Sequence, residues 1–123
     1  MANDLQLLAT WTFNAPCPIP SDVENMLVNG EVAVCAYKTI RDVAIFTNKR
    51  LIVRDAQGLT GKKVEIYTLP YSSIVMYSTE NAGKLLDVNA EVEMWTKAGK
   101  IKINLNRDVN IRELDNVIAS YLL

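Results

Sequence analysis

Hydrophobic and polar residues alternate along most of the chain between Glu31 and Asn106. Short runs rich in Val, Ile, Tyr and Thr are separated by turn-forming residues. Successive side chains of a β-strand point to opposite faces, so a period of two indicates strands rather than helices. The pattern predicts seven strands, at 31–38, 41–47, 50–55, 63–69, 73–79, 86–96 and 100–106.

The alternation is clearest in the last two predicted strands. In 86–96 the even-numbered residues as far as Met94 are apolar, and in 100–106 every odd-numbered residue is apolar. Each of these strands should bury one face and expose the other, as the strands of an antiparallel sheet commonly do. Residues 97–99 between them predict a hairpin turn.

Two earlier predicted strands, 31–38 and 73–79, are apolar on both faces. Such a strand needs a cover on its second face, because a large exposed apolar patch is rare on a protein without a partner. The sequence leaves three covers open: a helix, the N-terminal segment, or another subunit.

The segment before the first predicted strand is unlike the rest of the chain. Residues 14–20 contain three prolines in alternation, which favours an extended chain and ends any helix before it. We therefore separate an N-terminal arm, residues 1–20, from a domain at 21–123. Trp11 and Phe13 of this arm either clamp a neighbouring subunit or belong to a loose tail.

Two helices are predicted, one at each end of the domain. Ser21 and Glu24 have the spacing of a capping box, which predicts a short helix at 22–28 before the first strand. The segment 110–122 predicts an amphipathic helix that lies on the sheet or closes one end of a barrel. Its apolar stripe consists of Ile111, Leu114, Val117, Ile118, Tyr121 and Leu122.

These elements define an all-β fold with a C-terminal α-helix, as a seven-stranded antiparallel barrel or sandwich capped by the helix. Several short motifs occur along it in a fixed order. They are Glu31, Arg41-Asp42, Phe46 to Ile52, Gly58 to Lys63, Pro70 to Ile74, Ser78 to Gly83 and Ser120 to Leu123. The order of elements is that of a pleckstrin-homology (PH) domain, and the motifs resemble the bacterial PH-like family, long known only as a domain of unknown function.

The resemblance covers nearly everything from Glu31 onward and leaves residues 1–20 unassigned. It implies a single PH-like domain that assembles into a cyclic homo-oligomer, often with five subunits. It also implies that neighbouring strands and a polar surface at the subunit junctions bind a protein partner, and it brings no catalytic activity. The apolar second faces of 31–38 and 73–79 independently favour oligomerisation.

Composition narrows the chemistry that this chain can carry out. The 123 residues have a net charge of −1 and include no histidine, which removes Ser-His and Cys-His nucleophile pairs and the commonest ligand of transition metals. Cys17 and Cys35 form no CxxC motif, and two thiols in a reducing cytoplasm are favoured over a disulfide. We expect a cytoplasmic, non-catalytic protein with no metal, no cofactor and no nucleic-acid partner.

Charge is distributed unevenly along the chain. Seven of the 13 basic residues but only two of the 14 acidic residues lie in 38–63, so this region carries +5 and the remainder −6. A local excess of positive charge attracts acidic partners, although the solvated turns of a small barrel are also rich in lysine. The residues predicted to bind a protein partner are Arg41, Asp42, Thr47, Asn48, Lys49, Arg50, Lys62 and Lys63.

The same cations offer an alternative function, attachment to anionic lipid at a membrane surface. Eukaryotic PH domains hold lipid headgroups with a basic loop between their first two strands, whereas here only two residues separate Lys38 from Arg41. So tight a hairpin disfavours a headgroup pocket, and lipid binding is the second choice. Gly58 to Lys63 also departs from a phosphate-binding loop, because two residues rather than four separate its glycines and a strand follows.

Overall fold

The computed structural model describes residues 6–57, 62–81 and 90–123. Within them lie eight β-strands, two short 3-10 helices and one α-helix. The strands are β1 (Leu7–Cys17), β2 (Ala33–Thr39), β3 (Val43–Thr47), β4 (Arg50–Gln57), β5 (Lys63–Pro70), β6 (Ile74–Glu80), β7 (Ala90–Thr96) and β8 (Lys100–Leu105). The helices are η1 (Ser21–Met26), η2 (Tyr71–Ser73) and α1 (Ile111–Leu122).

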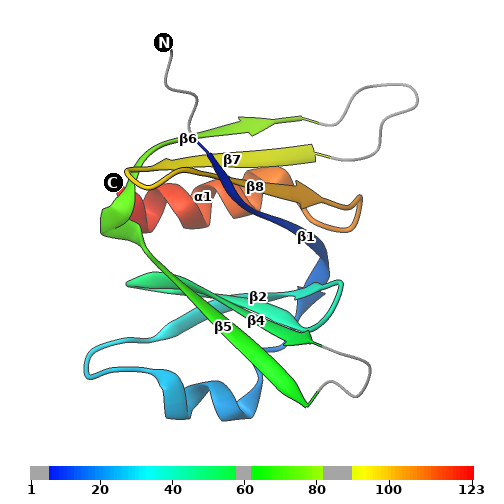
Figure 1. The fold of residues 1–123 in the computed structure, drawn as a ribbon, viewed down its shortest axis with the longest axis vertical. Helices are drawn as coiled ribbons and strands as arrows, with labels where there is room; N and C mark the ends of the chain where they lie inside the picture. The colour runs from blue at the N-terminus through cyan, green and yellow to red at the C-terminus, as the bar shows by residue number, and fades with distance from the viewer. Residues whose placement is uncertain (1–5, 58–61, 82–89) are drawn as a thin grey trace.

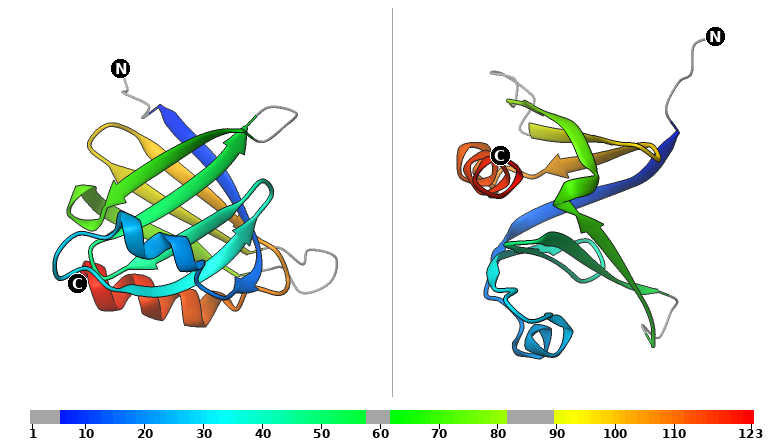
Figure 2. Two further views of the ribbon diagram at one scale, coloured as in Figure 1. Left: turned by 90° about the horizontal axis from the view of Figure 1, so that it is seen from below. Right: turned by 90° about the vertical axis from the view of Figure 1, so that its left-hand side faces the viewer.

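The eight strands form one sheet in the order β5-β4-β3-β2-β1-β8-β7-β6. The sheet folds over into two layers, and β1 crosses from one layer to the other (Figure 1). α1 lies at one side between the two layers (Figure 2). The all-β fold with a C-terminal helix is confirmed. The sheet has eight strands rather than seven, however, and it is not a closed barrel, because its two end strands, β5 and β6, do not pair with each other.

β1 is the strand that the sequence analysis did not predict. It pairs antiparallel with β2 from Phe13 to Cys17 and parallel with β8 from Leu7 to Phe13. Phe13 is fully buried, and its ring stacks on Tyr37 at a centroid distance of 5.4 Å. Residues 7–17 of the segment set apart as an arm are thus an inner strand of the sheet. Phe13 belongs to the core of its own chain rather than to a clamp or a loose tail.

Prolines hid β1 from the sequence analysis. Proline has no N–H to donate, so it is normally confined to edge strands, first residues and bulges. Here Pro16 faces Tyr37 close to a shift of register between Phe13 and Ala15. β1 pairs with β8 only as far as Phe13, so at Pro16 it has a neighbouring strand on one side only, and this edge-like position accommodates a residue that has no N–H.

The short helix expected before the first strand follows β1 instead. η1 is a 3-10 helix whose N-cap residue is Pro20, and no side chain bonds to this cap, so the predicted capping box does not form. The amide of Val23 donates to the Pro20 carbonyl at 3.1 Å. Val23 is fully buried against apolar residues of β2, β3 and β4. η1 therefore covers the outer face of these strands, which is the cover that the 31–38 strand required.

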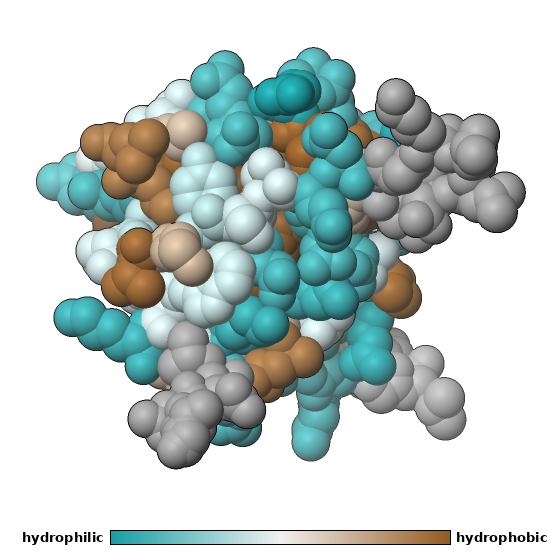
Figure 3. Space-filling model, turned by 90° about the horizontal axis from the view of Figure 1, so that it is seen from above, coloured by the Kyte–Doolittle hydropathy of each residue, from teal (hydrophilic) through white to brown (hydrophobic). Residues whose placement is uncertain are grey.

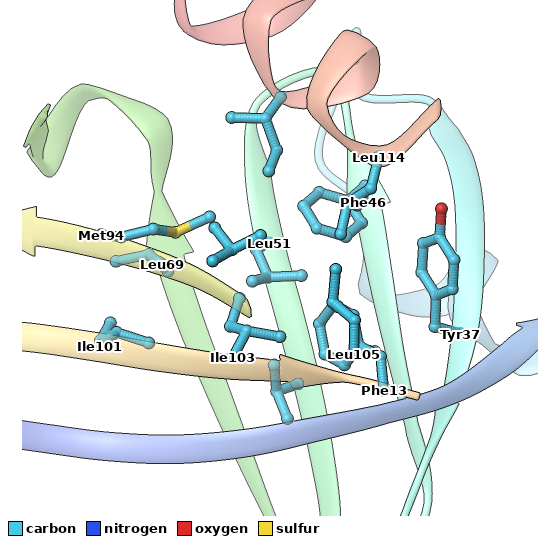
Figure 4. Packing of buried hydrophobic residues seen from close by; sticks show 14 of the residues in the cluster. Phe13, Tyr37, Phe46, Leu51, Leu69, Met94, Ile101, Ile103, Leu105 and Leu114 are labelled. Atoms are coloured by element: carbon cyan, nitrogen blue, oxygen red, sulfur yellow. The ribbon is translucent and has the colours of Figure 1, made fainter. Parts of the chain in front are cut away.

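The main core fills the space between the two layers and α1 (Figure 4). It combines side chains from β1, from both layers of the sheet and from the helix. Its fully buried residues include Phe13, Phe46, Leu51, Ile103, Leu105, Leu114 and Ile118.

α1 confirms the helix predicted at 110–122. The side-chain oxygen of Asn110 accepts from the amides of Arg112 and Glu113 at 2.9 and 3.1 Å, which satisfies two amides of the first turn. The Tyr77 hydroxyl of β6 donates to Asp115 at 3.0 Å. The helix is thereby attached to the sheet by a polar contact as well as by its buried apolar stripe.

β7 and β8 confirm the alternation read from the sequence, since buried and partly exposed residues take turns along both strands. On the outer face, Lys100 lies 2.9 Å from Glu93, and Lys102 lies 3.5 Å from Glu91. Hydrophilic residues run across this layer when it is viewed from the top of Figure 1 (Figure 3). Residues 86–89 of the predicted strand lie outside the described residues.

The two end strands carry exposed apolar side chains. On β5, Val64 and Ile66 are each 48% exposed, and on β6, Val75 is 63% and Met76 55% exposed. Within the described residues, the second face predicted for 73–79 therefore has no cover from its own chain.

Candidate functional site

Glu31 and Arg50 form the most buried of the ion pairs between described residues. Arg50 Nε and Nη2 donate to the two carboxylate oxygens at 2.8 and 3.1 Å, and the Glu31 side chain is fully buried. Nη2 also donates to the Met26 carbonyl at 2.7 Å, and Nη1 donates to the Thr68 hydroxyl at 3.1 Å. One guanidinium therefore ties β4 to β5 and to the end of η1.

Thr47 and Val28 complete the surroundings of the Glu31 carboxylate. The Thr47 hydroxyl donates to Oε2 at 2.7 Å, and the Val28 amide donates to Oε1 at 3.0 Å. The hydrogen bonds from Arg50 are the main cause that lowers the pKa of Glu31 to about 2, with help from Val28 and Thr47 and against the effect of burial. Glu31 is thus a charged anchor inside the fold.

Asn48 and Lys49 form the tip of the turn between β3 and β4. The Asn48 side chain accepts from the Val32 amide at 2.8 Å and donates to the Gly30 carbonyl at 3.1 Å. Gly30 has a φ of +82°, a conformation that glycine adopts readily. Asn48 therefore holds the loop before β2 in place, whereas the side chain of Lys49 is exposed.

Asp42 pairs with an arginine of its own sheet. Arg54 Nε and Nη2 donate to its carboxylate at 3.0 and 3.2 Å, and Arg54 Nη1 donates to Asp22 of η1 at 2.9 Å. The hydrogen bond to Asp42 is the main cause that raises the pKa of Arg54. Asp42 thus joins the turn between β2 and β3 to β4 and η1, and its charge is balanced within the molecule.

Arg41 lies in the same turn but has a looser partner. Its Nη1 is 3.8 Å from Asp55 Oδ2, and the two side chains are 59% and 25% exposed. This separation exceeds the length of a hydrogen bond. The guanidinium of Arg41 is therefore accessible in a way that those of Arg50 and Arg54 are not.

Lys62 and Lys63 lie at the base of the hairpin between β4 and β5, and both are exposed. Lys63 opens β5 opposite Gln57. Residues 58–61 of the glycine-containing motif lie outside the described residues.

The eight predicted residues do not form a single surface. β3 runs from residue 43 to 47, so Arg41 and Asp42 precede it at one end while the turn at 47–50 follows at the other. Lys62 and Lys63 share the end of Arg41, because Lys63 pairs with Gln57, the last residue of β4, and Lys62 directly precedes it. Thr47, Asn48, Arg50 and Asp42 are buried or partly buried and form hydrogen bonds within the chain. Arg41, Lys49, Lys62 and Lys63 are the exposed members of the set.

Sequence analysis missed a pocket that lies beside Arg41. It has a volume of about 430 Å³ and is lined by residues of β1, β4 and β5 and of the turn after β2. The rings of Trp11 and Tyr67 form one wall, with centroids 5.6 Å apart and planes tilted by 60°. Asp55 and Val53 of β4 also line it. The residues that line the pocket are far apart in the sequence, which explains why no sequence motif pointed to it.

A family model described as the bacterial PH domain matches residues 4–122, almost the entire chain. The chain therefore belongs to the bacterial PH-domain family, and the resemblance drawn from the sequence is confirmed. The match includes β1, the strand that sequence analysis had left unassigned.

Two proteins of Bacillus subtilis are similar in sequence. The uncharacterized protein YjqA is 34% identical over 105 residues, which cover 83% of each chain. The uncharacterized protein YozO is 30% identical over 100 residues, or 81% of this chain and 86% of that protein.

Solved structures give the same assignment. A DUF1696 family protein with a PH domain from Shewanella loihica has a TM-score of 0.81 at 32% identity, with 89% of this chain and 97% of that chain covered. A PH domain from Shewanella amazonensis has a TM-score of 0.68 at 36% identity, with 84% of each chain covered. A bacterial PH-domain protein from Exiguobacterium sibiricum, at 18% identity, shares the fold, with a TM-score of 0.55 over 92% of this chain and 62% of that one.

PH domains are in general non-catalytic. No helix in the described part of the chain is both long enough and apolar enough to cross a membrane.

Proposed function

We propose that this chain is a non-catalytic binding module that assembles into a cyclic homo-oligomer and presents a polar surface to a protein partner. The observation that carries the proposal is the open sheet: within the described residues, its end strands β5 and β6 each have a neighbouring strand on one side only. An unpaired edge offers a row of backbone N–H and C=O groups to a strand from another chain.

The side chains of these two edges favour association between copies. Val64 and Ile66 on β5 and Val75 and Met76 on β6 are about half exposed or more. Pairing β5 of one copy with β6 of the next would bury apolar surface from both strands. Because the two edges differ, the contact is head-to-tail, and repeated head-to-tail contacts close into a ring when the rotation between copies permits. Five subunits is the number that we favour.

The ring would repeat the exposed cations around its axis. Arg41, Lys49, Lys62 and Lys63 are the exposed members of the predicted site. A weak contact to an acidic protein surface gains strength when several copies bind at once, without any new interaction in each copy. We assign partner binding to these four residues, with Asp42, Thr47, Asn48 and Arg50 supporting the turns that present them.

Attachment to anionic membrane remains the alternative, and internal pairing of the cations disfavours it. Arg50 is held by Glu31, and Arg54 by Asp42 and Asp22. Two of these three carboxylates, those of Glu31 and Asp22, lie outside the 38–63 region and so reduce the local excess of positive charge. A protein surface of matching shape needs less net charge than a lipid surface does.

The test is the absolute mass in solution, measured by light scattering after size exclusion over a range of concentrations. We expect the wild type to have one stable mass at a small multiple of 13.8 kDa. The variant Ile66→Lys places a charge on the β5 edge and should fall to the monomer mass. Val32→Lys is the matched control, because Val32 is 62% exposed but lies outside the strands. A wild-type monomer at every concentration would refute the ring.

A further inference from the structure

Among the strands that the structure describes, the N-terminal half of β1 has a neighbour on one side only. β1 pairs with β8 from Leu7 to Phe13, but its pairing with β2 starts at Phe13 and continues to Cys17. β2 ends at Thr39 and the chain turns away into β3. Residues 7–12 therefore form a second kind of sheet edge, inside the fold rather than at either end of the strand order.

The backbone of Thr10 faces this internal edge. The carbonyl of Phe13 accepts from the amide of Asn106 at 3.0 Å, which directs the peptide groups of Phe13 toward the β8 side. Successive residues of a strand direct their N–H and C=O groups to alternate sides. Trp11 therefore shares the direction of Phe13, and Thr10 turns its N–H and C=O the other way.

The pocket of about 430 Å³ lies along that edge. Five consecutive residues of β1, from Leu8 to Thr12, line it, as expected of a hollow that follows a strand lengthwise. Five residues of a strand span about 16 Å. Its other lining residues are residues 39–41, Val53, Asp55 and Tyr67. We call this hollow the β1 notch.

The notch combines apolar and charged recognition groups. Trp11 and Tyr67 offer aromatic surface at a centroid distance of 5.6 Å, enough to hold an apolar side chain between or against them. Arg41 lines the notch, and within the described residues its closest polar contact is Asp55 at 3.8 Å. The arginines at structural positions, Arg50 and Arg54, instead have donors at 2.7 to 3.2 Å from their acceptors.

We infer that the β1 notch binds an extended segment of a protein partner, which adds as a strand to the free edge of β1. The segment would bond to the backbone of Thr10, place an apolar side chain against Trp11 and Tyr67, and bring a neighbouring carboxylate to Arg41. This inference rests on the proposed function and deepens it, because it names where and how the partner binds.

Other occupants fit the notch less well. A compact phosphate group would use Arg41 but neither the row of backbone groups nor the aromatic surface of Trp11 and Tyr67. A second copy of the chain is already accommodated by the β5 and β6 edges. An extended peptide is the ligand that uses the backbone edge, the aromatic wall and the arginine together.

The test begins with random heptapeptides displayed on phage and selected on the wild-type protein, since seven extended residues span the notch. The enriched peptides should carry an apolar residue close to Asp or Glu. A fluorescent copy of the strongest peptide then reports affinity by polarisation. We expect the Kd to rise roughly tenfold or more in Arg41→Glu, through loss of a charge-assisted hydrogen bond. Arg112→Glu, the same charge reversal at an exposed residue of α1 that does not line the notch, should leave the Kd unchanged.

Thr10→Pro tests strand addition itself. Proline removes an N–H that faces the notch and leaves the β8 ladder its donors, so the same peptide should bind roughly tenfold more weakly. Thr10→Val retains the N–H and should bind as the wild type does. If Thr10→Pro does not fold, amide exchange at Thr10 in the wild type replaces it, and the peptide should slow that exchange.

Several results would overturn the inference. One is that no peptide is enriched whose binding depends on Arg41. Another is that binding depends on Arg41 but neither Thr10→Pro nor amide exchange at Thr10 responds. A third is that soluble inositol phosphate displaces the peptide while neither the Thr10→Pro substitution nor amide exchange at Thr10 shows an effect. That result would assign the pocket to phosphate instead. The mass of the same wild-type preparation separates the two proposals. A stable ring that does not bind the peptide would refute only this inference. A monomer that binds the peptide would refute only the ring.

Discussion

Glu31 and Arg50 face each other in a bidentate ion pair, with oxygen–nitrogen distances of 2.8 and 3.1 Å and the glutamate side chain fully buried. They are 19 positions apart along the chain. This pair connects the loop before β2 to β4, and it shapes the turn that presents Lys49. An arginine that looked like a ligand for a partner is thus the internal partner of a buried carboxylate.

Removal of Arg50 should destabilise the protein strongly. Arg50→Ala would leave the Glu31 carboxylate buried without its cation, a change that typically costs about 3–5 kcal/mol of unfolding free energy. Because Arg50 is 19% exposed, we expect the lower end of this range. Urea denaturation measures the change. Lys49→Ala, the neighbouring cation, is the control and should shift the free energy by no more than about 0.5 kcal/mol. Equal effects of the two substitutions would contradict the internal role of Arg50.

Stability should fall in acid because of Glu31. The folded protein holds the pKa of Glu31 at about 2, below its ordinary value near 4.5, so the folded state favours the ionised form. The stabilisation is complete above the ordinary value and is lost as the pH falls from about 5 toward 2. Unfolding free energies of the wild type and Glu31→Gln should therefore converge over that range. Parallel curves for the two proteins would show that Glu31 does not supply the acid sensitivity.

Gly99 should not tolerate a larger residue. A Cβ at this position would overlap the backbone oxygen of Gln6 and the side chain of Leu8. Gly99→Ala must therefore push β1 away from the hairpin between β7 and β8, and overpacking of this kind costs about 1–3 kcal/mol. Ala98→Ser, at the exposed neighbouring position, should be nearly neutral. Thermal and urea denaturation measure the stability of both variants. If Gly99→Ala were as stable as Ala98→Ser, the close packing of Gly99 against β1 would be contradicted.

Anionic membranes should not retain the protein at physiological ionic strength. The cations of 38–63 are partly neutralised by Glu31, Asp22 and Asp42. Sedimentation with phosphatidylserine vesicles at about 0.15 M salt should leave the protein in the supernatant. Co-sedimentation that declines as salt rises, and that is lost in Lys49→Glu or Lys63→Glu, would instead favour the lipid alternative.

The sequence predicted those elements that can be recognised from a short stretch of residues, through periodicity or a capping residue. α1 has a helical stripe and a capping asparagine, and β7 and β8 alternate clearly. β1 was missed because it contains Pro16, which is tolerated where β1 pairs with β2 alone, beyond the end of its ladder with β8. No local pattern in the sequence shows where that ladder ends. The order and openness of the sheet depend on pairing between distant strands, which a local pattern does not encode.

The candidate site was harder to predict for a similar reason. Sequence identified Arg41 and Arg50 as exposed turn cations of the same kind, but the structure gives one a loose contact at 3.8 Å and the other a buried carboxylate. Trp11 and Tyr67 come together only because β1 and β5 lie across the folded sheet from each other. Charge and residue type were visible in the sequence, whereas the partners that decide their roles were not.

Head-to-tail pairing of β5 with β6 is the central claim, and mixing two blocked variants tests it most directly. Ile66→Lys blocks the β5 edge, and Met76→Lys blocks the β6 edge. Each variant alone should have the 13.8 kDa mass of one chain. Their mixture retains one intact β6 edge and one intact β5 edge, so light scattering should detect a dimer of about twice that mass. A dimer of either variant by itself, or a mixture that stays monomeric while the wild type forms an oligomer, would contradict head-to-tail assembly through these strands.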